Sequence, residues 1–174
     1  MIRKVRLLVV LLAVLLGSGF MNMEGAQAKA PEKGAVAPQF VLKDLKENTV
    51  SLRHVYSQNK VTLVNFWATW CPPCRMEIPD LNRLYSQYKH KSVEIIGVNL
   101  EKDPEAVAKF VAANQMKFPI VIDPQNQVAT KYQVFGIPTT YVLDQNGRIR
   151  HVIQGAASYQ KLQAVVEEVL KESK

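Results

Sequence analysis

The two cysteines of this chain, Cys71 and Cys74, lie three positions apart in the stretch "NFWATWCPPCRMEIP". Two thiols at this spacing can form a structural disulfide, supply half of a zinc site or exchange electrons with another disulfide. A disulfide that closes so short a loop would stabilise the domain by only about 2 kcal/mol. Zinc needs about four ligands, and the chain adds only His54, His90 and His151, without ligand spacing. A working redox couple is therefore the favoured interpretation.

The residues on either side of the pair support this interpretation. The apolar run "VTLVNFWA", residues 61–68, predicts a strand buried on both faces, and a helix is predicted over residues 72–88. Cys71 then lies at the N-terminal end of that helix, where unpaired N–H groups and the helix dipole stabilise a thiolate. We expect Cys71 to be exposed and to attack a client disulfide. Cys74, one turn on, should be shielded and resolve the mixed disulfide.

The elements that must position the pair alternate between strand and helix patterns, which predicts one α/β domain with a mixed sheet flanked by helices. "QFVLKDL" and "TVSLRHV" flank "KEN" and predict an N-terminal β-hairpin. "VEIIGVNL" predicts a second buried strand, and "DPEAVAKFVAAN" a helix capped by Asp103. The prediction is completed by a short strand at "FPIVID", a short helix at "NQVATKYQV", a hairpin through Asn146-Gly147 and a last helix capped by Ser158.

Two motifs in this frame carry a family resemblance. "FWATWCPPC" resembles the active-site corner of the thioredoxin superfamily, and "GIPTT", residues 136–140, resembles its second signature. In that superfamily the signature proline, here Pro138, follows a cis peptide bond and lies against the two cysteines. The resemblance covers nearly all of residues 35–174 and implies a thioredoxin-like fold. The N-terminal apolar segment, the "APQFVLKDL" opening and the "EIP" of the helix narrow it to the TlpA/ResA-like extracytoplasmic thiol–disulfide oxidoreductases.

This resemblance implies an activity and its partners. Members of the group commonly keep cysteines of exported client proteins reduced, including the haem-attachment cysteines of apocytochromes c in cytochrome c biogenesis. They draw their electrons from a membrane-embedded thiol reductase. We therefore expect a protein-disulfide reductase that uses no cofactor and no metal, acts on a disulfide-containing client and is a monomer.

Glu77 is the residue predicted to move a proton at the site. Thioredoxin itself carries a buried aspartate in the strand before the corner, and the matching residue here is Asn65, which cannot take a proton. Glu77 lies three residues after Cys74, on the same face of the predicted helix, where a carboxylate can accept the Cys74 proton. The resemblance agrees, because ResA-like proteins have a functional glutamate at this spacing. A solvated charge near a helix N-terminus is the alternative.

The two prolines between the cysteines bear on the direction of electron flow. Pro73 has no N–H and withholds one donor from the Cys71 sulfur, which predicts a less stabilised thiolate and a more reducing couple. Helix-start geometry is the alternative reason for a Pro-Pro pair.

Pro138 is expected to present backbone groups to an extended client strand. Glu101 follows the second buried strand, and a solvated charge at the strand end is the favoured interpretation, with a place at the active-site end of the sheet as the alternative. Client binding is assigned to Trp70, Pro72, Pro73, Ile137 and Thr139.

The N-terminal residues predict export. Three basic residues precede the apolar run at residues 7–20, and these 14 residues are fewer than the roughly 20 that span a bilayer as a helix. We predict a signal peptide over residues 1–28, with "AQA" at the cleavage site, and an uncleaved membrane anchor as the alternative. Residues 29–34 are a predicted linker and residues 35–174 the domain, which is delivered outside the cytoplasm in either case.

Charge and motif content leave few rival functions. The formal charge is +7, and +5 for residues 29–174, because residues 1–28 hold three basic residues and one acid. The excess is scattered, without the basic stripe interleaved with aromatics that nucleic-acid binding would suggest.

A disulfide-forming oxidase or isomerase on the same site and a chaperone-like client-binding module remain as rivals. A thiol peroxidase is the third, since "VAPQFVLKDL" also resembles the start of peroxiredoxins, but the Pro-x-x-x-Thr-x-x-Cys setting of their cysteine is absent.

Overall fold

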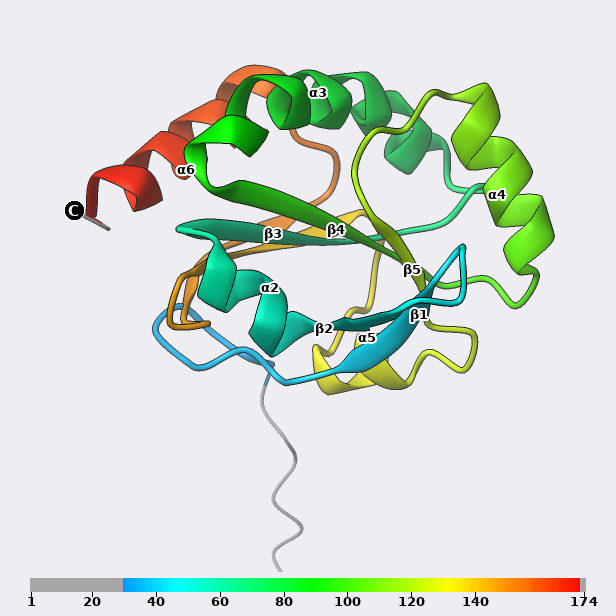
Figure 1. Cartoon of the computed structure of the whole chain (residues 1–174), viewed down its shortest axis with the longest axis horizontal. Coiled ribbons are helices and arrows are strands. Elements are labelled where there is room, and N and C mark those ends of the chain that lie inside the picture. The colour runs from blue at the N-terminus through cyan, green and yellow to red at the C-terminus, as the bar shows by residue number, and fades with distance from the viewer. Residues whose placement is uncertain (1–29, 173–174) are drawn as a thin grey trace, which may run out of the picture.

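The computed structural model describes residues 30–172, and a mixed β-sheet forms their centre (Figure 1). Its strands are β1 (Val41–Asp44), β2 (Thr49–Ser51), β3 (Val61–Trp67), β4 (Val93–Asn99), β5 (Ile120–Ile122), β6 (Thr139–Asp144) and β7 (Ile149–Gln154). They lie in the order β2-β1-β5-β4-β3-β6-β7. Strands β3, β4 and β5 are parallel, whereas β1, β6 and β7 pair antiparallel with their neighbours. The predicted mixed sheet is confirmed.

Helices cover both faces of this sheet. They are α2 (Leu52–Gln58), α3 (Pro72–Tyr88), α4 (Pro104–Ala113), α5 (Gln127–Lys131) and α6 (Tyr159–Glu172), with a short 3₁₀ turn, η1 (Lys89–Lys91). Figure 1 shows α3 and α6 above the sheet and α2 and α5 below it. The predicted signal or anchor, residues 1–28, lies outside the described residues. Within residues 30–172, none of the helices has the length and apolar character needed to cross a membrane.

Strand β3 is the element that carries the chain to the cysteines. All seven of its residues are buried, as the continuous apolar run predicts. Alternate side chains enter two different cores: Leu63 and Trp67 pack on the α3 and α6 side, and Val64 and Phe66 on the opposite side. Because β3 is held by β4 on one edge and β6 on the other, its C-terminal end is a rigid place from which to start an active-site turn.

The N-terminal hairpin is confirmed, with one correction. β1 and β2 pair antiparallel, but the run "TVSLRHV" does not continue as a strand, because α2 begins at Leu52. The buried residues of α2 are Leu52 and Tyr56, which are four positions apart and lie on one helical face. A strand that buried both would also turn His54 to the buried face, whereas the helix leaves His54 exposed.

The other predicted turns and caps agree with the structure. The Asp103 side chain accepts hydrogen bonds from the N–H groups of Glu105 and Ala106 at the start of α4. Ser158 Oγ accepts one from Lys161 N at 3.4 Å at the start of α6. Gly147 turns the β6–β7 hairpin with φ +71°, and a Cβ there would lie 2.7 Å from the Tyr56 ring.

Candidate active site

Cys71 and Cys74 form a disulfide at the junction of β3 and α3. The S–S distance is 2.15 Å and the two Cα atoms lie 5.3 Å apart. Cys71 is the N-cap residue of α3, and its N–H donates to the Ala68 carbonyl at 3.3 Å, which closes the turn after β3. The strand-to-helix placement of the pair, predicted from the apolar run and the helix start, is confirmed.

The expectation that Cys71 is exposed is wrong for this disulfide-bonded form. Cys71 is 3% and Cys74 2% exposed, so both sulfur-bearing side chains are covered. Both cysteines are part of the hydrophobic core on the α3 and α6 side of the sheet, together with Trp67 and Ala68. A reagent that opens this disulfide must therefore reach sulfur-bearing side chains that are covered in the disulfide-bonded form.

Few hydrogen-bond donors face the Cys71 sulfur. Pro72 and Pro73 begin α3 without an N–H, and the first donor of the helix, Cys74 N, lies 3.3 Å from Cys71 Sγ. On the other side, the Ile137 carbonyl oxygen lies 3.6 Å from the same sulfur. A thiol at this position can donate to that carbonyl, whereas a thiolate would be repelled by its partial negative charge. Both features make the environment of Cys71 a weak stabiliser of a thiolate.

The loop before β6 brings the second signature to the disulfide. The Ile137–Pro138 peptide bond is cis, and Ile137 is the residue whose carbonyl approaches Cys71. Thr139 is buried, and its hydroxyl donates to the Gly136 carbonyl at 2.7 Å, which ties the loop to the start of β6. The residues assigned to client binding thus lie on two segments that meet at Cys71.

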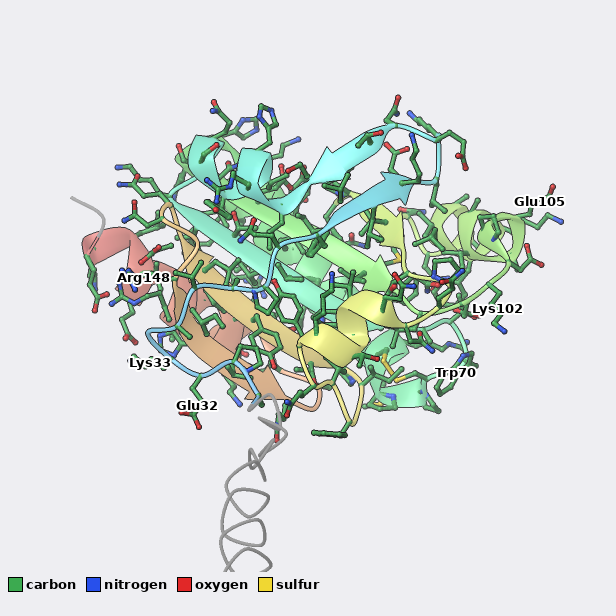
Figure 2. All side chains as sticks on the ribbon, turned by 90° about the horizontal axis from the view of Figure 1, so that it is seen from below. Glu32, Lys33, Trp70, Lys102, Glu105 and Arg148 are labelled. Atoms are coloured by element: carbon green, nitrogen blue, oxygen red, sulfur yellow. A yellow bond between two sulfur atoms is a disulfide. The ribbon has the colours of Figure 1, made fainter. Side chains whose placement is uncertain are left out.

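Trp70, which precedes Cys71 and is also assigned to client binding, is largely exposed. Its side chain is 67% accessible, and Figure 2 shows it at the surface near the sulfur atoms. Pro72 and Pro73 are exposed as well, at the first turn of α3. Trp67, three residues earlier, is fully inside the core. The corner therefore presents one tryptophan to solvent and uses the other for packing.

Glu77 is buried in the protein instead of being solvated. It is 2% exposed and lies one helical turn after Cys74 on α3. One carboxylate oxygen accepts a hydrogen bond from Ala157 N at 2.9 Å, and the other accepts from Asn65 Nδ2 at 3.2 Å. Asn65 Nδ2 also donates to Thr140 Oγ1 at 2.8 Å, its partner residue across β3 and β6. Asn65 therefore positions the glutamate from the place where thioredoxin has its aspartate.

Burial sets the protonation of this glutamate. It raises the pKa of the Glu77 carboxyl from 4.5 to about 7, and the nearby charge of Asp80 acts in the same direction. The hydrogen bonds from Ala157 and Asn65, together with Lys161, act against this rise in pKa. A group with a pKa near 7 can both accept and return a proton at neutral pH, which is what a general acid–base requires.

Glu101 lies at the active-site end of the sheet and contacts the turn before the cysteines. Its carboxylate accepts hydrogen bonds from Thr69 N at 2.7 Å and from Thr69 Oγ1 at 2.8 Å, so it holds the turn that precedes Trp70 and Cys71. Asn99 Nδ2 donates to it at 3.1 Å and fixes it at the end of β4. The interpretation as a solvated charge is therefore wrong. The alternative, a place at the active-site end of the sheet, is the one that the structure shows, because β3 and β4 are parallel neighbours and end at the same edge.

Glu101→Gln tests this contact. The amide has one acceptor oxygen and no charge, so it cannot accept from both Thr69 groups as the carboxylate does. Hydrogen bonds to charged groups contribute about 1.5–3 kcal/mol, and we expect exchange of the Thr69 amide hydrogen to accelerate by roughly tenfold or more. Hydrogen exchange read by NMR measures this directly. Glu105→Gln, at an exposed acid of α4, is the matched control (Figure 2), and equal exchange in both variants would contradict the assignment.

Comparison with known proteins agrees with this geometry. The model of the AhpC/TSA family matches residues 33–152. A thiol-disulfide oxidoreductase ResA from Geobacillus kaustophilus is 36% identical over 169 residues, which cover 97% of this chain and 95% of that protein. The match to the AhpC/TSA family agrees with the peroxiredoxin-like opening, but adds no peroxidatic cysteine setting to the sequence.

Solved structures show the same fold. A candidate thiol:disulfide interchange protein DsbE from Chlorobium tepidum superposes with a TM-score of 0.75 at 31% identity, covering 81% of this chain and 99% of that one. The thioredoxin domain of a thiol-disulfide oxidoreductase from Bacteroides vulgatus gives a TM-score of 0.71 at 29% identity, with the same two coverages. The expected thioredoxin-like fold is thereby confirmed.

Proposed function

Because this chain belongs to the AhpC/TSA family and is a thiol-disulfide oxidoreductase of the ResA and DsbE type, we propose that it reduces disulfides in exported client proteins. The environment of the Cys71 sulfur supports this direction of electron transfer, from the enzyme to the client. A single N–H donor, from Cys74, and a carbonyl oxygen, from Ile137, lie close to it. Poor stabilisation of the thiolate raises the energy of the reduced form, so the dithiol tends to give its electrons away.

The exchange proceeds in two steps that balance in electrons. The Cys71 thiolate attacks one sulfur of the client disulfide, forms a mixed disulfide and releases the other client sulfur as a thiolate. The Cys74 thiolate then attacks Cys71 Sγ, which forms the Cys71–Cys74 disulfide and releases the second client thiolate. Two electrons have moved from the enzyme dithiol to the client. An external dithiol, which we propose to be a membrane-embedded thiol reductase, restores the reduced enzyme.

Glu77 is proposed to move the proton in the second step. Cys74 is buried, so its thiol needs a nearby base before it can attack. Glu77 lies one turn away on the same helix, and its pKa of about 7 leaves a fraction of the carboxyl free to accept that proton at neutral pH. Asn65 and Ala157 keep the carboxylate in place during the transfer through the two hydrogen bonds described above.

The client is proposed to bind across the two segments that meet at Cys71. Trp70, Pro72 and Pro73 supply exposed surface on one side of the disulfide. On the other side, Ile137 and Pro138 in the loop before β6 and Thr139 at the start of β6 supply backbone along which an extended client segment can lie. We propose that residues 1–28 export the domain or anchor it to the membrane, with residues 29–34 as the linker, so that exchange takes place outside the cytoplasm.

The reduction potential of the Cys71–Cys74 couple tests the direction. Equilibration of the protein with dithiothreitol or glutathione buffers measures it. We expect a value near that of thioredoxin, about −270 mV, or below. A value near the strong oxidants, about −120 mV, would make the protein a disulfide donor and overturn the proposal.

Apocytochrome c is the client proposed first, on the basis of the resemblance to the TlpA/ResA-like group. A peptide with an oxidised Cys-x-x-Cys-His motif tests it, since that sequence is the haem-attachment motif. We expect the reduced protein to open this disulfide faster than that of a scrambled peptide with the same two cysteines. Equal rates would argue for a broad pool of clients.

A further inference from the structure

Large apolar side chains gather on the segments that hold the disulfide. Among residues 30–172, the exposed large hydrophobic side chains are those of Val36, Val41, Trp70, Met76, Phe135 and Val152. Trp70 precedes Cys71, Met76 lies on the first turns of α3, and Phe135 lies on the loop that contains the cis peptide bond. Phe135 is 93% exposed, more than any other of these residues. An aromatic ring left in water next to a reactive disulfide indicates a surface that a partner covers.

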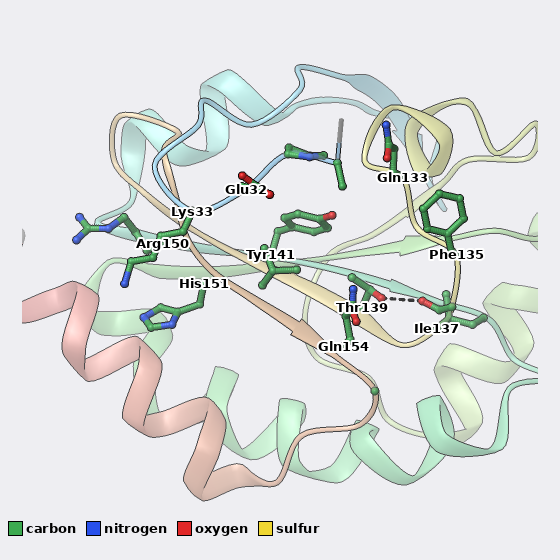
Figure 3. Close-up of a pocket in the computed structure, with 15 residues that line it drawn as sticks. Glu32, Lys33, Gln133, Phe135, Ile137, Thr139, Tyr141, Arg150, His151 and Gln154 are labelled. Atoms are coloured by element: carbon green, nitrogen blue, oxygen red, sulfur yellow. Dashed lines mark hydrogen bonds between the residues drawn. The ribbon is translucent and has the colours of Figure 1, made fainter. Parts of the chain in front are cut away.

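A hollow begins at the same loop. Its volume is 940 Å³, and Phe135 and Ile137 line one end while Lys33 and Arg150 line the other. Figure 3 shows Tyr141 between these ends, with the Phe135 ring at the mouth nearest Ile137. The hollow therefore leads from the residue next to Cys71 along β6 and β7. Its elongated form suits an extended polypeptide.

The charges around the hollow indicate the chemistry of its occupant. At the end near Ile137 the polar groups are uncharged, from Gln133 and Gln154. The far end carries Lys33, Arg150 and His151, of which Arg150 is paired with Asp144 and Glu172. The end nearest the disulfide thus offers an aromatic ring and neutral polar groups, a surface for an apolar side chain and not for a charged one.

The spacing of Phe135 and Ile137 limits how far this apolar side chain of the client can lie from the client's reacting cysteine. Ile137 O is 3.6 Å from Cys71 Sγ, so a client cysteine that reacts at Cys71 lies beside Ile137. Phe135 is two residues away, at most about 7 Å for an extended backbone. An extended client strand advances by the same step per residue. The client residue that meets Phe135 is therefore two or three positions from its cysteine.

We propose that Phe135 and the hollow beside it bind an extended client segment that carries a large apolar side chain two or three positions from its reacting cysteine. This inference rests on the proposed function, because disulfide exchange at Cys71 is what brings the client to Ile137. Phe135 acts as a specificity residue: it contacts the client but takes no part in the exchange of sulfur bonds.

Three substrates and four proteins test this proposal. The substrates are two symmetric peptide disulfides, with either phenylalanine or serine two positions on each side of the cysteine, and hydroxyethyl disulfide, which is too small to reach Phe135. The proteins are the wild type, Phe135→Ala, Phe135→Leu, which keeps an apolar side chain, and Val41→Ala, which removes an exposed apolar side chain on β1, toward the opposite edge of the sheet from β6. Each is reduced first, and kcat and KM are measured separately.

We expect the wild type to prefer the phenylalanine peptide over the serine peptide by about tenfold or more in kcat/KM. Phe135→Ala should bring this preference close to unity through KM, while Phe135→Leu and Val41→Ala retain most of it. Hydroxyethyl disulfide should react equally with all four proteins.

A preference that survives in Phe135→Ala, or is missing in the wild type, would overturn the inference and leave the proposed function intact. Failure of reduced wild type to open hydroxyethyl disulfide and both peptides would instead overturn the proposed function. Sedimentation of the wild type tests the other occupant, a second copy of the chain. A dimer that Phe135→Ala converts to monomer would also overturn the inference.

Discussion

Cys71→Ser is expected to lower the rate of disulfide exchange by about 10³-fold or more, because it removes the thiol that we propose forms the bond to the client. Cys74→Ser should have a different result. Cys71 can still attack, but nothing resolves the product, so the protein accumulates as a mixed disulfide with its client. The two variants are nearly the same size as the wild type at the mutated atoms, which makes them a matched pair.

Mass spectrometry after mixing each reduced variant with a client disulfide distinguishes these results. A covalent adduct with Cys74→Ser and none with Cys71→Ser supports attack by Cys71 and resolution by Cys74. Adducts with Cys71→Ser alone would reverse the two roles. A double variant, Cys71→Ser with Cys74→Ser, that still rescued a deletion strain would favour the client-holding module over the reductase.

Glu77→Gln is expected to change both catalysis and stability, and both effects depend on pH. The proposed general base must be deprotonated to act, so the wild-type rate of resolution should rise as pH increases through about 7, where Glu77 titrates. Glutamine cannot accept the proton, and we expect the variant to resolve the mixed disulfide about 10²-fold more slowly at pH 8, without that rise. Single-turnover rates over pH 5–9 measure this. A variant with the wild-type rate across this range would exclude the role.

The free energy of unfolding should fall as pH rises, in the opposite direction to the rate of resolution. The folded protein binds the Glu77 proton more tightly than the unfolded chain, because the pKa rises from 4.5 to about 7 on folding. The free energy of unfolding contributed by this group is therefore present below pH 4.5 and is lost as pH rises to about 7. The loss amounts to roughly 3 kcal/mol at most. Urea unfolding of the disulfide-bonded wild type should show this decline.

The matching stability experiment compares three proteins at pH 5 and pH 8. Glu77→Gln keeps the side-chain shape without a carboxyl to titrate, so its decline between the two pH values should be smaller than that of the wild type. Glu105→Gln, which removes an exposed carboxyl, should decline as the wild type does. An identical pH dependence in Glu77→Gln and the wild type would show that the carboxyl titrates normally.

Elements whose signals are local could be predicted from the sequence. The bounds of α3, the cap of α4 by Asp103 and the β6–β7 turn at Gly147 agree with the structure. Each depends on residues within a few positions of one another, through helix caps, turn conformations and apolar periodicity. The error at α2 has the same origin: Leu52 and Tyr56 fit a helical face, but the residues before them alternate as in a strand.

The sequence by itself determined the chemistry available at the corner: two thiols three positions apart and two prolines without N–H groups between them. These are covalent properties and persist in any fold. The tertiary structure alone decided how that chemistry is tuned, because Glu77 is buried by the sheet and held by Ala157, 80 residues away, and Glu101 reaches Thr69 across two strand ends. Such contacts form only when distant segments exclude water from the same place, and the loss of water is what moves the pKa of the carboxyl.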